Sequence, residues 1–248
     1  MILEVTLLTV FVAALITALA TGLGALPLLF SRQLDDRWLS VGAALAAGLM
    51  LAASHSLVDE GSATNAWLVL AGMATGLLFV LAADRWLDGQ DTPDVGELQG
   101  ADAKKALLIL GVMTAHSFAE GVGVGVSYGG GQELGTFITV AIAVHNIPEG
   151  LAIALVLVPR GMPVWKAGLW AIFTSLPQPL MAVPAYLFVT AFEAFLPVGL
   201  GLAAGAMIWM VFAELLPDAQ RRLSPSGVGV LVVVAFMSML AFQLAIHH

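Results

Sequence analysis

The sequence contains no cysteine, few charged residues and very few basic ones. Cysteine is absent from all 248 residues, which excludes disulfide bonds, thiolate metal sites and thiol chemistry. Charged residues make up 10% of the chain, against about 25% in ordinary soluble domains, and only 9 residues are Lys or Arg. The net charge of -8 leaves no cluster of cations for binding nucleic acid. These deficits exclude an ordinary soluble enzyme, a disordered chain and a nucleic-acid-binding protein.

Apolar sequence is abundant instead, and hydrophobic residues make up 60% of the chain. They form eight runs, each long enough to cross about 30 Å of hydrocarbon as a helix. The runs are continuously apolar without a two-residue alternation, so helices are predicted rather than strands of a barrel. We therefore predict an all-α integral membrane protein with eight transmembrane helices, at about residues 2–30, 38–57, 65–83, 105–128, 134–158, 164–190, 196–217 and 225–246.

The basic residues are confined to one set of loops. All nine lie in, or within one residue of, the loops that follow spans one, three, five and seven: Arg32, Arg37, Arg85, Lys104, Lys105, Arg160, Lys166, Arg221 and Arg222. Under the positive-inside rule these loops face the cytoplasm, and both termini are extracytoplasmic. We therefore predict a multi-pass protein of the cell membrane. Residues 1–248 are expected to form one transmembrane domain, with a solvated cytoplasmic loop at 84–104 between spans three and four.

Two successive spans carry ionisable residues near their midpoints, where a charge costs at least about 2.5–3.5 kcal/mol. The fourth span reads AHSFAEGVGVG and the fifth reads VHNIPEGLAIA. In each span a histidine precedes a glutamate by four residues, so the two side chains lie on one helix face. Both motifs begin about 11–12 residues into antiparallel spans, and therefore at about the same depth. We expect four residues to converge on one point: His116, Glu120, His145 and Glu149.

Imidazole and carboxylate ligands suit a divalent transition metal, and two carboxylates balance its charge in a region of low dielectric. A hydrogen-bonded His–Glu pair that only stabilises helix packing is the alternative for one motif. Two such motifs at matched depth favour a metal site. Pro148 supports this interpretation, because a proline interrupts helical hydrogen bonding and such breaks are tolerated at membrane depth where the backbone lines a cavity.

The HNIPEG motif, preceded by HSFAEG one span earlier, resembles the ZIP family of metal transporters. The resemblance covers the whole chain, including its spans and the variable loop between spans three and four. It implies a 3+2+3 helix arrangement with an inverted repeat, and uptake of Zn²⁺ or a related divalent ion into the cytoplasm. It also implies a metal that is transported rather than held as a cofactor, and members of the family are often homodimers.

The resemblance further implies two adjacent metal sites on spans four and five, as in bacterial members of the family. The first would use the four His and Glu residues named above. The second would use the positions of Ser117, Asn146 and Gln178, with the two glutamates bridging. This chain departs from the family pattern there, because Ser117 and Ala119 replace Asn and Pro, and Gln178 stands where span six usually carries an acid. With a carboxylate lost, we expect one tightly bound ion rather than two.

Other polar residues suggest a path for the ion. The two prolines that flank Gln178 are expected to break span six at the depth of the site, where the amide oxygen could be a weak ligand. At the outer end of span two, His55, Asp59 and Glu60 could collect metal, although solvated cap residues would give the same pattern. Glu214, near the cytoplasmic end of span seven, could receive the ion or could simply lie at the interface.

Two other functions are compatible with a metal site deep in the membrane. An intramembrane metal-dependent hydrolase would use the ion to activate water. However, both deep glutamates are assigned as ligands, and no other deep acid remains to act as a general base. A metal sensor or scaffold is the second alternative. The favoured function is a carrier of divalent metal ions, not an enzyme.

Overall fold

The computed structural model describes the chain except for residues 1–4, 31–35, 89–113, 115–116, 159–160 and 247–248. Every regular element in this described part is helical. In chain order the elements are α1 (Leu7–Leu23), α2 (Pro27–Phe30), α3 (Asp36–Asp88), a helix at 117–129, α5 (Gln132–Leu157), α6 (Val164–Ser175), α7 (Pro177–Ala191), the 3₁₀ turn η2 (Glu193–Phe195), α8 (Leu196–Met210), the π-helical turn η3 (Val211–Leu215), α9 (Leu216–Gln220) and α10 (Pro225–Ile246).

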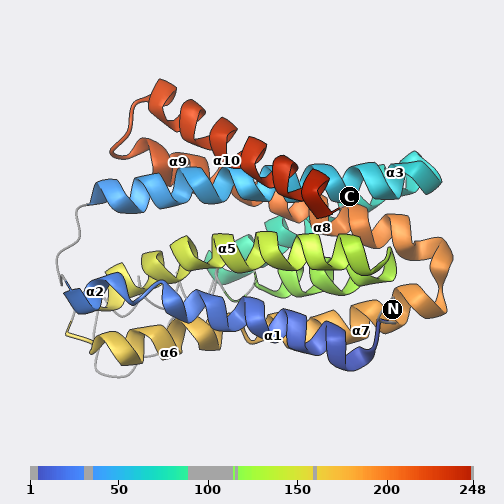
Figure 1. The fold of residues 1–248 in the computed structure, drawn as a ribbon, viewed down its shortest axis with the longest axis horizontal. Coiled ribbons are helices and arrows are strands. Elements are labelled where there is room, and N and C mark those ends of the chain that lie inside the picture. Colours follow the sequence, from blue (N-terminus) through green and yellow to red (C-terminus); the bar gives the residue numbers. More distant parts are fainter. Residues whose placement is uncertain (1–4, 31–35, 89–113, 115–116, 159–160, 247–248) are drawn as a thin grey trace.

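The helices form two groups that lie along one common direction (Figure 1). In one group α3 packs against α8, α9 and α10, and in the other α1 packs against α5, α6 and α7. Helix α5 also contacts α3, so it joins the two groups through the middle of the molecule. Residues of α5 are therefore placed where a central site would lie.

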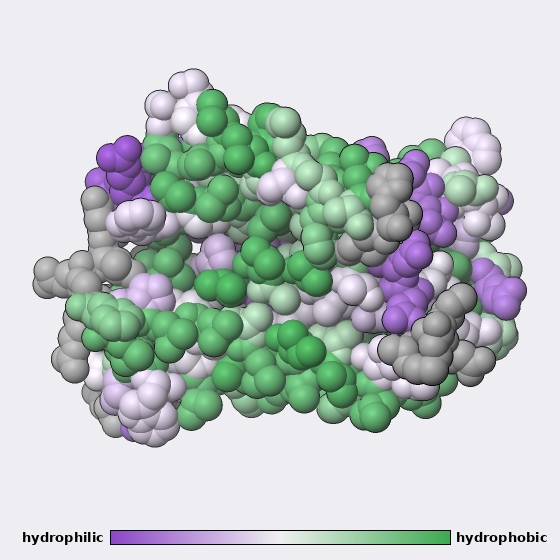
Figure 2. Space-filling model, in the orientation of Figure 1, coloured by the Kyte–Doolittle hydropathy of each residue, from purple (hydrophilic) through white to green (hydrophobic). Residues whose placement is uncertain are grey.

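The surface is that of a membrane protein. Figure 2 shows apolar residues over most of the middle of the molecule and strongly hydrophilic residues near its two ends. Within the described residues, six helical segments are long and apolar enough to cross a bilayer: Leu7–Phe30, Arg37–Ala82, Gln132–Leu157, Val164–Ala191, Glu193–Gln220 and Pro225–Ala245. The chain is thus an all-helical, multi-pass membrane protein.

The segment Arg37–Ala82 contains two helices that meet at Asn65, where the backbone leaves helical geometry (φ -160°, ψ 99°). The side-chain oxygen of Asn65 accepts hydrogen bonds from the backbone N–H groups of Trp67 (3.1 Å) and Leu68 (3.2 Å). Asparagine is a favoured N-cap for this reason, so it starts the second helix as the first one ends. The spans that we expected at 38–57 and 65–83 leave a loop at 58–64, and this part of the prediction is wrong, because those residues are helical and the turn is made at one position.

Helix α3 also extends beyond its expected end. We placed the start of the cytoplasmic loop at residue 84, whereas the helix continues through Asp88. Most of the predicted loop, residues 89–104, lies outside the described residues. The polar composition that suggested a loop therefore begins within the last turn of a helix.

The sixth apolar run is broken as its prolines predict. Helix α6 ends at Ser175 and α7 begins at Pro177, with Leu176 between them. Proline is tolerated at the first position of a helix because the N–H group that it lacks would have no helical partner there. Pro179 follows in the first turn of α7, and together the two prolines place Gln178 at the start of a new helix.

Close backbone contacts bring the site-bearing helices together. A side chain at Gly150 of α5 would overlap the backbone oxygen of Thr21 on α1. A Cβ atom at Gly121 would lie 2.6 Å from the backbone oxygen of Gln178 and 2.7 Å from its Cα. Only glycine permits such an approach. Gly121 therefore allows the helix at 117–129 to lie directly against the first turn of α7.

Candidate metal centre

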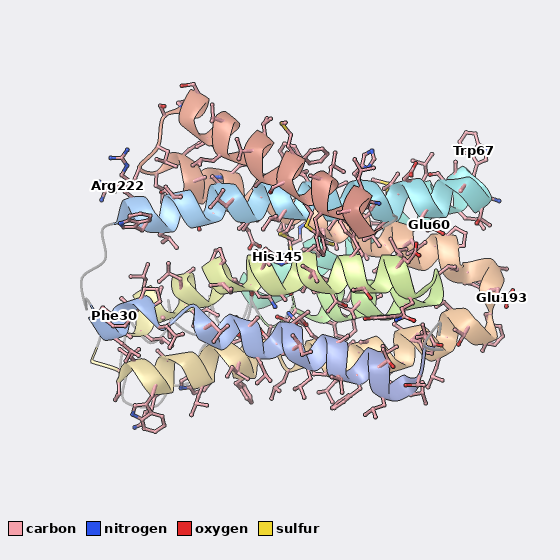
Figure 3. All side chains as sticks on the ribbon, viewed as in Figure 1. Phe30, Glu60, Trp67, His145, Glu193 and Arg222 are labelled. Carbon is pink, nitrogen blue, oxygen red and sulfur yellow. The ribbon has the colours of Figure 1, made fainter. Side chains whose placement is uncertain are left out.

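Three ionisable residues meet inside the bundle. Glu120 comes from the helix at 117–129, and His145 and Glu149 come from one face of α5. Each offers one ligand atom, and these atoms lie within 4.8 Å of one another. The exposed fractions are 0% for Glu120, 2% for His145 and 9% for Glu149. His145 lies near the middle of the long axis, between the end that carries Arg222 and the end that carries Trp67 (Figure 3).

The contact between His145 and Glu120 is short and requires a proton between the two atoms. Nδ1 of His145 lies 3.1 Å from the backbone oxygen of Ala141, which only accepts hydrogen bonds, so Nδ1 carries a proton. In the neutral imidazole Nε2 is then an acceptor, yet it lies 2.5 Å from Oε1 of Glu120, which is also an acceptor when ionised. Two acceptors approach this closely only when a proton lies between them. A metal ion bound by both atoms at about 2.0–2.2 Å would take the place of that proton and hold the two atoms somewhat further apart.

The second oxygen of Glu120 has a different partner. Nε2 of Gln178 donates a hydrogen bond of 2.6 Å to Oε2 of Glu120. Gln178 is fully buried, and its position next to Glu120 follows from the close approach at Gly121. We expected the amide oxygen of Gln178 to face the metal site, but in this structure the amide nitrogen does.

The oxygen of the Gln178 amide points toward α1 and α5. It accepts hydrogen bonds from Oγ1 of Thr17 (2.5 Å) and from Nδ2 of Asn146 (3.3 Å). Asn146 also donates through Nδ2 to the backbone oxygen of Thr17 at 2.8 Å. All three side chains are fully buried. One amide group thus links Glu120 with α1, α5 and α7.

The structure brings five of the seven predicted site residues into one connected group: Glu120, His145, Glu149, Asn146 and Gln178. Ser117 lies one turn before Glu120 on the same helix and is fully buried. Among the described residues, its hydroxyl oxygen and Oδ1 of Asn146 have no hydrogen-bond partner. His116 lies outside the described residues.

Thr17 is the member of this group that sequence reasoning missed. It lies in the first apolar run, which also carries Thr21 four residues later. That spacing puts both hydroxyls on one face of α1, and both are fully buried. The pair of threonines in an otherwise apolar helix is the signal that could have identified this face. Thr21 lies 2.8 Å from the hydroxyl of Ser175 rather than at the Gln178 amide.

A cavity of about 50 Å³ opens beside the group. Its lining residues include His145 and Glu149 of α5 together with Glu214 and Asp218. Pro148 also lines this cavity, but α5 continues as one helix from Gln132 to Leu157, so the break that we expected at this proline does not occur. Glu214 belongs to the π-helical turn η3, a type of irregularity that often occurs at functional sites.

A second cavity, of about 570 Å³, lies near Glu60, at the other end of the long axis from Arg222 (Figure 3). Its walls include the carboxylates Asp59, Glu60 and Glu133. Asp59 and Glu60 are among the residues that we expected at an outer mouth. Among the residues that line either cavity, in the described part of the chain, the charged ones are all acidic. Both cavities are therefore suited to attract cations rather than anions.

An apolar helical bundle with a buried carboxylate–imidazole group, placed between two acidic cavities, defines a membrane protein built to handle a cation. The sequence model of the ZIP zinc transporter family matches residues 88–226, which is more than half of the chain. The chain belongs to the ZIP family. Family membership favours a transporter over the intramembrane hydrolase considered above.

Individual relatives agree with this assignment. Zinc transporter GufA of Myxococcus xanthus is 33% identical over 228 residues, covering 85% of this chain and 88% of the relative. Zinc transporter ZIPB of Bordetella bronchiseptica is 33% identical over 221 residues, covering 82% of this chain and 70% of the relative. A protein of Arabidopsis thaliana is 48% identical over 244 residues, and these cover 97% of this chain but only 39% of the relative's length.

Proposed function

We propose that this chain carries a divalent transition metal ion across the membrane, with Zn²⁺ as the ion that its ligands suit best. The observation that supports this most directly is the convergence of Glu120, His145 and Glu149 at one buried point. Imidazole nitrogen and carboxylate oxygen both bind zinc at about 2.0–2.2 Å. Ligand atoms within 4.8 Å of one another need only small shifts to bind the same ion. His116 remains the proposed fourth ligand because of its four-residue spacing from Glu120.

The charge of the group favours one bound ion. Glu120 and Glu149 together balance a single 2+ ion, so the occupied site is neutral and avoids the large penalty of burying net charge. The adjacent positions, occupied by Ser117, Asn146 and Gln178, are uncharged. The Gln178 amide also occupies the second oxygen of Glu120, which a bridging carboxylate would need for a second ion. We therefore propose that Ser117, Asn146 and Gln178 support the site without binding a second ion.

The membrane topology that we propose has eight spans. The six apolar segments become seven when the segment at 37–82 is divided at Asn65, and the helix at 117–129 supplies the eighth. Both termini would then lie on one side, extracytoplasmic by the distribution of basic residues. The 3+2+3 arrangement with an inverted repeat and the homodimer are proposed on the family resemblance. The single transmembrane domain over 1–248 is proposed from the apolar composition of the chain.

With this orientation, the two cavities would provide an entrance and an exit for the ion. The cavity lined by Asp59, Glu60 and Glu133 would face outward and raise the local cation concentration. The cavity lined by Glu149, Glu214 and Asp218 would lead the ion toward the cytoplasm. Secondary transporters generally work by alternating access, in which the binding site is open to one side of the membrane at a time. We propose uptake into the cytoplasm on this basis.

Transport by purified protein in liposomes tests the proposal. Wild-type protein should take up Zn²⁺, and Glu149→Ala should abolish both Zn²⁺ binding and uptake, because the cavity-facing carboxylate is lost. Glu193→Ala is the matched control, since Glu193 lies in η2 at the end of the molecule far from His145 and should change neither (Figure 3). A Glu149→Ala protein that still transports Zn²⁺ would overturn the proposed site. Wild-type protein that binds the ion but never moves it would instead favour a sensor.

A further inference from the structure

The orientation of the Gln178 amide, that is, which side its oxygen and its nitrogen face, is fixed by a series of contacts that begins at a backbone atom. The backbone oxygen of Thr17 can only accept a hydrogen bond, so the group of Asn146 that faces it at 2.8 Å must be the NH₂ group. The same nitrogen lies 3.3 Å from Gln178, so the atom of Gln178 that faces it must be the oxygen. The orientation of both amides thus follows from one carbonyl group of α1.

The hydroxyl of Thr17 reinforces this orientation. It lies 2.5 Å from Oε1 of Gln178 and can donate its proton there. With its oxygen directed to Thr17 and Asn146, Gln178 must direct its nitrogen to Oε2 of Glu120. The reversed amide would place an oxygen against the carboxylate of Glu120 and an NH₂ group against the NH₂ group of Asn146. Both contacts would be repulsive, and the low dielectric of a buried region strengthens that repulsion.

We propose that Thr17 is a positioning residue of the metal site, and that it acts through the Gln178 amide on Glu120. This inference rests on the proposed function. Because the amide holds Oε2, the other oxygen of Glu120 is directed at His145 and is ready to bind the ion together with Nε2. Partners of this kind orient metal ligands, and their loss typically lowers metal affinity by about 10–100-fold.

A role in helix packing alone does not require this contact. A buried threonine can satisfy its hydroxyl within its own helix, and Oγ1 of Thr17 lies 2.7 Å from the backbone oxygen of Ala14. Thr21, one turn further along α1, is equally buried and contacts Ser175, which holds no ligand. The two threonines therefore differ mainly in whether their hydroxyl reaches the amide that contacts Glu120. Thr21 is the matched control for Thr17.

The first experiment measures the Kd for Zn²⁺ of purified protein by competition with a metal-binding dye. Thr17→Val keeps the shape and the backbone oxygen but removes the hydroxyl, and should weaken binding by about tenfold, at the lower end of the range for partners of metal ligands. Thr17→Ser restores the hydroxyl and should bind within about twofold of wild type. Thr21→Val should also bind like wild type. Equal weakening by Thr17→Val and Thr21→Val would assign Thr17 to packing and overturn the proposal.

A double-mutant cycle with Gln178→Ala tests whether Thr17 acts through the amide. If it does, Thr17→Val should have no further effect on the Kd in the Gln178→Ala background, because the linking group is gone. If the effects of the two substitutions on the free energy of Zn²⁺ binding are additive, Thr17 does not act through the amide and the proposal is overturned. Failure of the proposed function looks different: Zn²⁺ would then fail to bind wild-type protein, or would bind Glu149→Ala as well as wild type.

Discussion

Gln178 donates a hydrogen bond from its amide nitrogen to Oε2 of Glu120, the carboxylate whose other oxygen faces His145. A neutral donor therefore occupies the side of Glu120 where a second cation would otherwise lie. The family pattern has an acid at the position of Gln178, which would repel Glu120 unless a cation separated them. A single substitution thus changes both the charge and the hydrogen-bonding role of this position.

The close approach at Gly121 makes this hydrogen bond possible and gives the first prediction. Gly121→Ala would place a Cβ atom 2.6 Å from the backbone oxygen of Gln178, so α7 must move away from Glu120. Overpacking of this kind costs about 1–3 kcal/mol, and the displaced amide should also weaken Zn²⁺ binding. Thermal unfolding in detergent and the Kd for Zn²⁺ measure the two effects.

Gly229→Ala is the control for this substitution, because a Cβ atom at Gly229 meets nothing within 4 Å. It should leave both the unfolding temperature and the Kd close to wild type. If Gly121→Ala behaves in the same way as Gly229→Ala, the contact between the two helices is looser than the structure indicates.

The deep residues of the site could be predicted because membrane burial restricts which polar residues occur there. The four-residue spacing in VHNIPEG places His145 and Glu149 on one face of α5, and the structure agrees. The break before Gln178 agrees with its two flanking prolines, but a proline alone does not decide where a helix ends, since α5 and α7 continue through Pro148 and Pro184. The spacing inference depends on local helix geometry, whereas the position of a break depends also on packing.

Asn65 and Thr17 show what the sequence could not reveal. The residues before Asn65 are polar enough to suggest a loop, yet they are helical. No longer loop is needed there, because the chain turns at Asn65 alone and this residue also caps the next helix. Thr17 could have satisfied its hydroxyl on its own helix, so its contact with Gln178 depends on how closely α1 approaches α5 and α7. The direction of the Gln178 amide depends on the same packing.

The absence of cysteine allows a direct test of topology with single introduced cysteines. Thr64→Cys and Ser226→Cys both lie at exposed positions, the first beside the turn at Asn65 and the second in the first turn of α10. In intact cells, a membrane-impermeant maleimide should label the first and should reach the second only after the membrane is opened. Labelling of both from outside would contradict the proposed eight spans.

Glu214 should affect the release of the ion more than its binding. It lines the cavity next to Glu149 but is not one of the residues that converge on His145. Glu214→Gln removes a negative charge from the wall of the path, so uptake in liposomes should slow several-fold while the Kd for Zn²⁺ stays within about twofold of wild type. Glu193→Gln is the control for charge at a distant position. A matching loss of affinity in Glu214→Gln would make Glu214 a ligand instead.

The strongest test of the single-ion proposal is Gln178→Glu. This change replaces the donor that contacts Glu120 at 2.6 Å with a carboxylate, and two carboxylates at that distance require a cation between them. The three carboxylates of the variant could balance most of the charge of two divalent ions, which bridged sites hold about 3.5–4 Å apart. Equilibrium dialysis with metal analysis should therefore give one ion per chain for wild type and two for Gln178→Glu.

Gln220→Glu is the control for this substitution. It adds the same charge at an exposed position at the end of α9, and this variant should still bind one ion per chain. Two ions in wild-type protein, both lost in Glu149→Ala, would show that neutral side chains suffice for the second ion and that the charge argument is wrong.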